Sequence, residues 1–206
     1  MKFISPDSKF AQVMTSIGEM MMLNLCWIIA SIPIITIGAS NIAMYTVMRR
    51  RLRKENSGTI VPFFKAWWSN IKQGIAFWLA QLLISASLGL SMFLTLPTFF
   101  KVISLIVLIL VSLTFSIIYP QIARFRNNWF AYLKNALVLL IPKLGWALLN
   151  MLMFLIPVGV FLVSPPFFLR LGWVWILFGF SVLFYLSSII MQKVLKPMED
   201  ISSRRK

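Results

Sequence analysis

The side chains that usually carry enzyme chemistry are scarce in this chain. Its 206 residues include no histidine, one cysteine and five acidic residues, which are Asp7, Glu19, Glu55, Glu199 and Asp200. Zinc sites, Ser-His-Asp triads and paired-carboxylate hydrolysis therefore lack their parts. No glycine lies in a G-x-x-x-x-G-K-[ST] loop, so the chain has no ATP-binding phosphate cradle of that type. We expect a protein that is not an enzyme and uses no cofactor or metal.

Four polar side chains within apolar runs are the first candidates for a functional role: Glu19, Asn24, Gln81 and Asn150. Because a charge is costly to bury in lipid, an ionisable group such as Glu19 is a functional candidate by default. Its spacing from Ser16 also fits a capping box, which would be a structural use. The three amides are expected to form hydrogen bonds between helices. The alternative is that they line a path for a solute.

Two short amphipathic segments carry the second group of candidates. In residues 62–72, apolar side chains recur from Phe64 to Ile71 at i, i+3, i+4 and i+7, with lysines on the other face, and residues 128–137 repeat the pattern. Tryptophans at headgroup depth and lysines near lipid phosphate predict two helices that lie in the cytoplasmic interface. A docking surface for another protein is the alternative. The candidate interface residues are Phe64, Trp67, Trp68, Lys72, Arg124, Arg126, Trp129 and Lys134.

The elements that hold these side chains are predicted to be membrane-spanning helices. Hydrophobic residues make up 60% of the chain and charged residues 12%, whereas soluble proteins are about half apolar and about a quarter charged. At about 20 residues a span, this composition supports about six spans in a single integral membrane domain, residues 1–206. Pro97, Pro120, Pro142 and Pro165 mark expected helix breaks. The expected spans of this all-α polytopic transmembrane bundle are 17–32, 40–53, 74–96, 99–119, 144–163 and 171–191.

The basic residues predict the orientation of these spans. They concentrate in 49–72, 124–143 and 193–206, and the loops between carry only Lys101 and Arg170. The positive-inside rule places the rich segments and the C-terminus in the cytoplasm of a multi-pass cell-membrane protein. The N-terminus is also cytoplasmic if 40–53 spans; if that segment merely re-enters, there are five spans and the N-terminus is outside. The net charge of +15 then points to anionic lipids of the inner leaflet, not to nucleic acid.

An internal similarity favours the six-span reading. Residues 40–96 and 99–163 each run from an apolar helix with a tyrosine and an arginine cluster, through an amphipathic segment, to a Lys-x-Gly step that opens the next span. The two steps are Lys72-Gln73-Gly74 and Lys143-Leu144-Gly145. A duplication of this kind predicts a parallel repeat about an axis along the membrane normal. A chance match between apolar segments is the alternative.

Three blocks of this sequence resemble the YesL-like family of bacterial membrane proteins, which is named as a domain of unknown function. The first runs from Asn24-Leu25-Cys26-Trp27 through Ile32-Pro33-Ile34-Ile35-Thr36-Ile37-Gly38-Ala39-Ser40 to Tyr45. The second is Phe63-Phe64-Lys65 with Asn70-Ile71-Lys72-Gln73. The third is Tyr119-Pro120, Ala123-Arg124-Phe125-Arg126-Asn127 and Leu133-Lys134-Asn135-Ala136. Arg126 departs from the family's pattern, in which an acidic residue is more common.

The resemblance implies a role in sugar uptake. Such proteins occur mostly in Gram-positive bacteria, often encoded beside sugar ABC importers, but this chain lacks the Glu-Ala-Ala loop with which importer permeases dock their ATPase. We therefore expect a non-enzymatic accessory membrane subunit that binds the permease subunits of an oligosaccharide ABC importer. The alternative is an independent small transporter or channel for a sugar or lipid-like solute. The sugar, the permease and the oligomeric state are left open.

Overall fold

All regular structure in the described part of the chain is helical. The structure, a computed structural model, describes residues 9–55, 58–95 and 97–204. The elements are α1 (Lys9–Ser31), the short 3-10 helix η1 (Ile34–Thr36), α2 (Ile37–Leu52), α3 (Ile60–Ser69), α4 (Ile71–Ser91), α5 (Thr98–Ile122), α6 (Trp129–Leu140), α7 (Leu144–Val163), α8 (Pro165–Arg170), α9 (Gly172–Val174), the π-helix η2 (Trp175–Gly179) and α10 (Phe180–Arg204). The predicted all-α architecture is confirmed.

Five helical segments are long and apolar enough to cross a membrane: Lys9–Ser31, Ile71–Ser91, Thr98–Ile122, Leu144–Val163 and Gly172–Met198. They identify a multi-pass membrane protein. The predicted sixth span, 40–53, lies in α2, which has 16 residues and is not among the five. At 1.5 Å a residue, α2 is about 24 Å long, less than the roughly 30 Å hydrocarbon core of a bilayer.

Helix α2 is the centre of the molecule. It packs against α1, α3, α4, α5 and α10, and Ile42, Ala43, Met44 and Met48 are fully buried along it. Other helices surround most of α2. A helix enclosed in this way can lie inside the protein although it is shorter than the hydrocarbon core of the bilayer. The core of the protein therefore lies around a short helix that the longer ones enclose.

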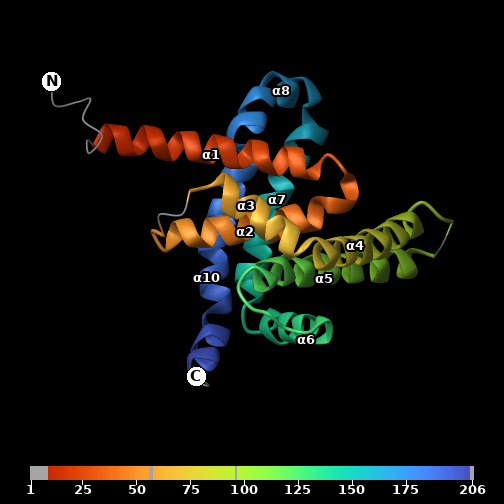
Figure 1. Ribbon diagram of the computed structural model, residues 1–206. Helices are drawn as coiled ribbons and strands as arrows, with labels where there is room; N and C mark the ends of the chain where they lie inside the picture. Colours follow the sequence, from red (N-terminus) through yellow and green to blue (C-terminus); the bar gives the residue numbers. More distant parts are fainter. Residues whose placement is uncertain (1–8, 56–57, 96, 205–206) are drawn as a thin grey trace.

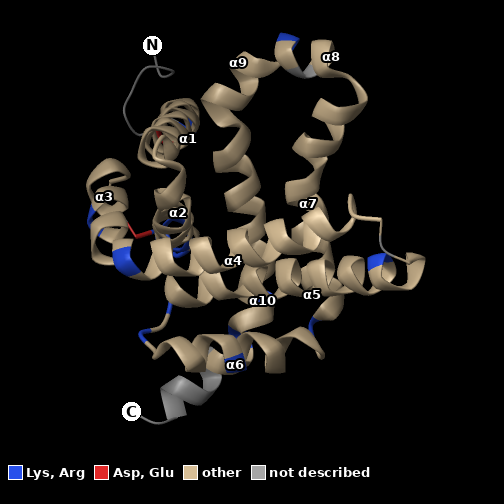
Figure 2. Ribbon diagram, turned by 90° about the vertical axis from the view of Figure 1, so that its right-hand side faces the viewer, with Lys and Arg blue, Asp and Glu red and all other residues tan. Residues whose placement is uncertain are grey.

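Two apolar hairpins leave this core in different directions (Figures 1 and 2). One is α4–α5, and the other is α7 with η2 and α10, closed at its tip by α8 and α9. Side chains far along both hairpins are exposed, among them Leu83, Phe93 and Leu162 at 65%, 88% and 72%. The bases of the hairpins, by contrast, are buried against α2. Exposed apolar surface of this extent is what contact with lipid requires.

The prolines only partly mark helix ends. Pro97 precedes α5, and Pro165 occupies the first position of α8. The break predicted at Pro120 is wrong, because α5 continues through this residue to Ile122. Pro120 lies in the last turn and forgoes one backbone hydrogen bond to the preceding turn without ending the helix.

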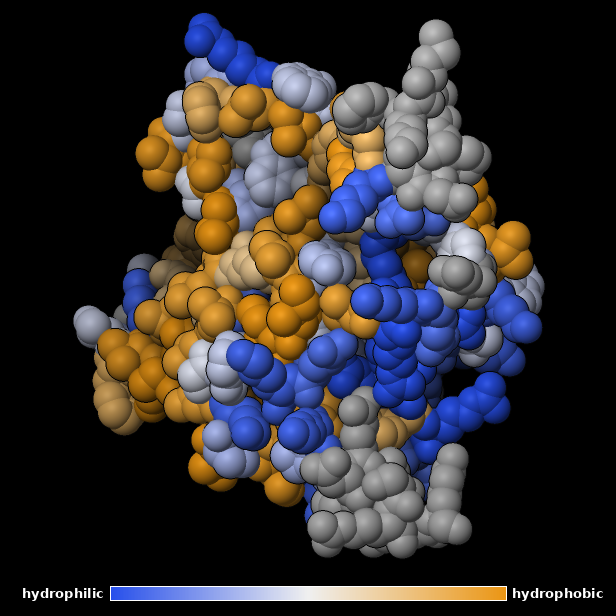
Figure 3. Space-filling view, turned by 90° about the vertical axis from the view of Figure 1, so that its left-hand side faces the viewer, coloured by the Kyte–Doolittle hydropathy of each residue, from blue (hydrophilic) through white to orange (hydrophobic). Residues whose placement is uncertain are grey.

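The basic side chains lie at two different ends of the long helices. Lys101 lies in the first turn of α5 and Arg170 ends α8, so both lie at hairpin tips. The arginine clusters lie at the C-terminal ends of α2 and α5, away from these tips. Figure 3 shows hydrophilic side chains gathered over the lower half of one face, with apolar surface above and beside them. The N-terminus, which the topology prediction also places, lies outside the described residues.

The two predicted repeat units contain the same order of elements. The first holds α2, α3 and α4, the second α5, α6 and α7, and a short helix links two longer ones in each. In both units the first long helix contacts the short helix and the last one. The duplication itself stays a prediction.

Candidate functional site

A cavity of about 330 Å³ lies where the bases of the two hairpins meet α1 and α2. None of the described residues that line it is charged. Seven are aromatic, contributed by six helices: Trp27, Tyr45, Trp78, Tyr119, Phe154, Phe180 and Phe184. The polar side chains in the wall are those of Asn41, Gln81, Ser112, Ser116 and Asn150, with the hydroxyl groups of the two tyrosines. We call this the central cavity.

The structure brings two of the sequence-predicted polar residues together here, because Gln81 of α4 and Asn150 of α7 both line the central cavity. Their carbonyl oxygens are already used by the protein. The Tyr119 hydroxyl donates to Gln81 Oε1 at 2.7 Å, and the Ser187 hydroxyl donates to Asn150 Oδ1 at 2.5 Å. Each of these bonds joins two different helices, which is the interhelical role expected of such amides.

Asn41 repeats this arrangement at the α1–α2 side of the central cavity. The indole Nε1 of Trp27, which can only donate, bonds to Asn41 Oδ1 at 3.0 Å. Two donors in the wall remain without an acceptor among the described residues: Nδ2 of Asn150, whose side chain is fully buried, and Nε1 of Trp78. An unpaired buried donor is costly, and both atoms are covered by the surrounding protein.

Asn24, the third predicted amide, lies elsewhere and has a structural partner. It is fully buried, and its Nδ2 donates to the carbonyls of Trp175 and Ile176 at 3.0 and 2.6 Å. Its Oδ1 accepts from the backbone N–H of Ser181 at 2.8 Å. A π-helix leaves the regular i to i−4 pattern, and Asn24 satisfies backbone groups at both ends of η2. This residue therefore fastens α1 to the start of α10.

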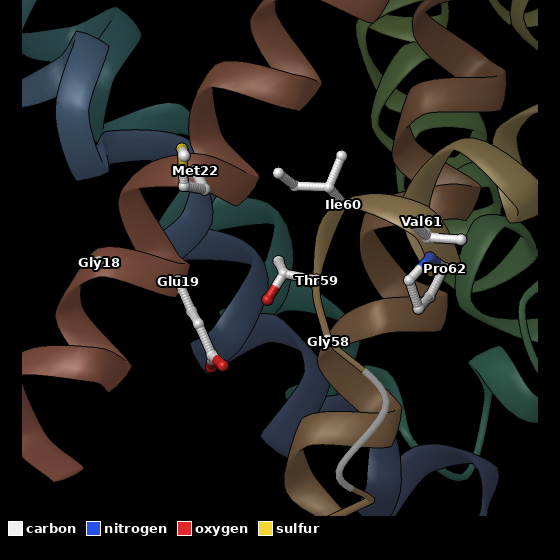
Figure 4. A pocket seen from close by; sticks show the side chains of 8 residues that line it. All are labelled: Gly18, Glu19, Met22, Gly58, Thr59, Ile60, Val61 and Pro62. Carbon is white, nitrogen blue, oxygen red and sulfur yellow. The ribbon is translucent and has the colours of Figure 1, made fainter. Parts of the chain in front are cut away.

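Glu19 is paired with a cation from α2. Its Oε2 lies 2.6 Å from Arg51 Nη1, and Arg51 Nη2 also donates to the Ser16 carbonyl at 3.0 Å and to the Ser16 hydroxyl. The same glutamate borders a shallow hollow of about 430 Å³ between α1 and residues 58–62 (Figure 4). Apart from Glu19 and Thr59, that hollow has an apolar or glycine lining. The geometry supports a role for Glu19 in joining α1 to the end of α2.

The arginine clusters of the two predicted repeats meet in one groove. This basic groove, of about 660 Å³, lies between the end of α2, helix α3 and the link from α5 to α6. Among the residues whose side chains the structure describes, no acidic one lines it. Its cations are Arg49, Arg50, Lys65, Arg124 and Arg126. Cations that line one concave surface focus a positive potential there, so the basic groove favours an anionic ligand.

Tyr132 fixes the link that carries two of these arginines. Its hydroxyl donates to the Phe125 carbonyl at 2.7 Å and accepts from the Asn127 N–H at 3.0 Å. Burial raises the pKa of Tyr132, partly offset by the Asn127 hydrogen bond and by the charge of Arg126. The phenol therefore remains a donor at neutral pH, and it holds the wall of the basic groove against α6.

Both predicted amphipathic helices have two apolar faces. In α3, Phe63 and Ala66 are buried, while Phe64 and Trp68 are 40% and 72% exposed. Trp67 is half-buried with its ring 6.0 Å from that of Trp68, and Lys72 is exposed at the start of α4. The predicted apolar stripe of this helix therefore includes residues of its outer face.

In α6 the inner face holds Tyr132 and Ala136. The outer face exposes Phe130 and Lys134, and Trp129 stacks on Phe77 with ring centroids 5.0 Å apart. Of the eight candidate interface residues, Arg124 and Arg126 line the basic groove and the other six do not. All eight lie on the helices and links that surround it or begin beside it.

Sequence reasoning missed Asn41 and Trp78 as site residues. A usable signal existed for Trp78, which precedes Gln81 by three positions and so shares a face of α4 with it. Asn41 lies in a short apolar run, and the sequence does not show that this run packs beside a cavity.

The fold and the charge distribution define a multi-pass α-helical membrane protein with an uncharged central cavity and a basic groove at one end. A family model described as "Protein of unknown function, DUF624" matches residues 20–92. This match covers the second half of α1 together with α2, α3 and α4. Neither the curated proteins nor the solved structures contain a match to this chain.

Proposed function

We propose that this protein is a non-enzymatic accessory subunit that binds the permease subunits of an oligosaccharide ABC importer. The importer class comes from the resemblance to YesL-like proteins, and the match to the family model over residues 20–92 supports that resemblance. The observation that carries a partner-binding role is the basic groove, flanked by the exposed outer faces of α3 and α6. A partner segment with acidic and apolar side chains fits both surfaces.

Charge complementarity is the reason to expect a protein partner at this place. Cations of the inner-leaflet surface attract anionic lipid at about 1 kcal/mol each, and cations that line one concave surface, Arg50, Lys65 and Arg126 among them, also select an acidic segment that can enter the groove. The exposed Phe64 and Trp68 of α3 and Phe130 of α6 add apolar contact area beside it. Aromatic residues are enriched in such interfaces.

The test is purification of the tagged protein from its native membrane after growth on the inducing oligosaccharide, with partners identified by mass spectrometry. Wild type should recover permease subunits. The pair Lys65→Gln with Arg126→Gln removes two groove cations. At up to about 1 kcal/mol for each ion pair, the double substitution should weaken the affinity for the permease by up to about 30-fold, and recovery should fall accordingly. Lys101→Gln, at a hairpin tip, is the matched control and should not change recovery. Recovery of wild type without any importer subunit would refute the proposal.

An independent small transporter or channel is the second candidate. The specific observation that favours it is the central cavity, in which Gln81 and Asn150 meet between the two hairpins. Purified protein reconstituted alone should then move solute across liposomes. Liposomes that remain impermeable to sugars and to lipid-like solutes would remove this candidate.

A further inference from the structure

We infer that one anionic phospholipid of the bilayer binds beside α1, with an acyl chain in the hollow of Figure 4 and its phosphate in a polar pocket that adjoins this hollow. The polar pocket, of about 530 Å³, lies between α1, the end of α2 with the link that follows it, and α10. The hollow and the polar pocket share Glu19, Gly58 and Thr59, so they meet at these residues. An apolar compartment that meets a charged one matches a molecule with the same two parts.

The hollow has the composition and the place of a site for an acyl chain. Met22, Ile60 and Val61 line it and are 50%, 42% and 77% exposed, so the described residues leave much of their apolar surface uncovered. In Figure 4, Met22 and Ile60 lie at one end of the hollow, and the oxygens of Glu19 and Thr59 lie toward the other. Helix α1 is long and apolar enough to cross a membrane, so lipid chains lie alongside it.

The polar pocket carries a net charge of +1 among its described residues. Its cations are Arg50, Arg51 and Lys54, and its acids are Glu19 and Glu55. Arg51 compensates Glu19 at 2.6 Å, which leaves two cations against one acid. A phosphodiester carries one negative charge, so a headgroup without an ammonium group, such as that of phosphatidylglycerol, neutralises the polar pocket. A zwitterionic headgroup has no net charge to offer, and the balance therefore favours the anionic lipid.

The order of the two compartments along α1 is that of a lipid in a bilayer. The polar pocket is lined from Gln12 to Glu19 of this helix, and the hollow from Gly18 to Met22. At 1.5 Å a residue, the two together cover about 15 Å of α1. The sequence predicts that the span begins at residue 17, so the polar pocket lies at the end of the span and the hollow further within it.

Lys54 has an unusual backbone for its residue type. Its φ of 57° lies in the left-handed region, which glycine and asparagine adopt more readily than lysine. Gly58 also has a positive φ, of 68°, in the link from α2 to α3. The lysine therefore keeps a cation at the polar pocket at a cost to the backbone, which supports a use of its charge.

The probe is phosphatidylglycerol with a diazirine in one acyl chain, added to the full-length protein in a nonionic detergent. After irradiation, peptide mass spectrometry measures the label on residues 59–62. This label should saturate at one lipid per chain. Unlabelled phosphatidylglycerol should displace the probe, and phosphatidylcholine with the same chains should need about a 5-fold higher concentration.

One variant tests the hollow. A Cβ added to Gly18 meets nothing within 4 Å, so Gly18→Leu fills open space in the hollow without a clash and should abolish the saturable label on residues 59–62. Gly89→Leu is the matched control, because Gly89 of α4 has equally open surroundings and lines neither compartment. It should leave the label unchanged.

A second variant tests the polar pocket. Lys54→Asn removes the cation but introduces a residue that tolerates the left-handed backbone, so the midpoint of thermal unfolding should not fall. The half-saturating concentration of the probe should rise about 5-fold. Arg53→Asn makes the same change of charge at a residue that lines neither compartment, and it should have no effect.

The inference is overturned if the label on residues 59–62 does not saturate, if phosphatidylcholine competes as well as phosphatidylglycerol, or if either variant behaves like its control. These readouts do not involve recovery of a permease, so this inference and the proposed function can fail separately. Arg50 and Pro62, which also line the basic groove, stay unchanged in every variant.

Discussion

Two glycines lie in a close contact between α2 and α4, and they give a sharp prediction. A Cβ built on Gly38 of α2 would lie 2.1 Å from the carbonyl oxygen of Gly74 of α4, and a Cβ on Gly74 would lie 2.4 Å from the backbone nitrogen of Ala39. Both distances are far below van der Waals contact, and both partners are backbone atoms that cannot rotate away. Either Gly→Ala change must therefore push α2 and α4 apart.

The magnitude follows from two opposing effects. Alanine is favoured over glycine within a helix by about 1 kcal/mol, while overpacking a well-packed contact costs about 1–3 kcal/mol or more. Since the clash involves backbone, we place Gly38→Ala and Gly74→Ala at the upper end, for a net loss of about 2 kcal/mol. At about 2–4 °C per kcal/mol for a chain of this size, the midpoint of thermal unfolding should fall by about 4–8 °C.

The assay is thermal unfolding of purified protein in one detergent, followed by circular dichroism. Gly89→Ala is the matched control, because Gly89 lies in the same helix α4 with nothing within 4 Å of its added Cβ. It should leave the midpoint unchanged or raise it. If Gly38→Ala or Gly74→Ala unfolds at or above the midpoint of Gly89→Ala, the close packing of α2 on α4 is refuted.

Three further predictions concern the polar contacts and use the same unfolding assay. Glu19→Gln should lower the free energy of unfolding by less than about 1 kcal/mol, because the ion pair with Arg51 is partly exposed. Arg51→Gln should lower it more, since this change also removes the hydrogen bonds to Ser16. An equal loss for the two variants would contradict this geometry. Asn24→Leu removes three hydrogen bonds and should cost about 2 kcal/mol, at about 0.6 kcal/mol for each bond between membrane helices; a neutral effect would mean that η2 is held in another way. Tyr132→Phe should lower stability by about 1 kcal/mol at neutral pH. Because burial raises the Tyr132 pKa in the folded state, this difference from wild type should be constant below about pH 10 and shrink above it; a difference that is already falling at neutral pH would contradict the assigned donor role.

Apolar composition was sufficient to predict the fold class, because runs near 20 residues long have few alternatives to membrane helices. It was not sufficient to assign α2. The apolar run that begins at residue 40 ends at the arginines 49–51 and is too short to show by itself whether it spans. Its enclosure by other helices is a tertiary property. The break predicted at Pro120 was wrong because this buried proline lies inside α5, which continues past it, and the sequence does not show the packing that surrounds it.

The same limit applies to the polar residues. Asn24, Gln81 and Asn150 look alike in the sequence, since each is an amide within an apolar run. Only the tertiary structure separates Asn24, whose amide is fully used on the backbone of η2 and Ser181, from the two that line the central cavity. The basic groove was likewise visible only as two separate arginine clusters, because their meeting depends on how α2 and α5 end beside each other.

The splayed hairpins have a mechanical consequence. Helix α8, at the tip of one hairpin, packs mainly on α7 and α9, so a force applied at the tip reaches the rest of the protein through the hairpin's two legs. Each hairpin is therefore held to the core mainly at its base, through the contacts of α4, α5 and α10 with α2. The central cavity lies at these bases, so a force on a tip would reach its aromatic wall through the two legs of the hairpin.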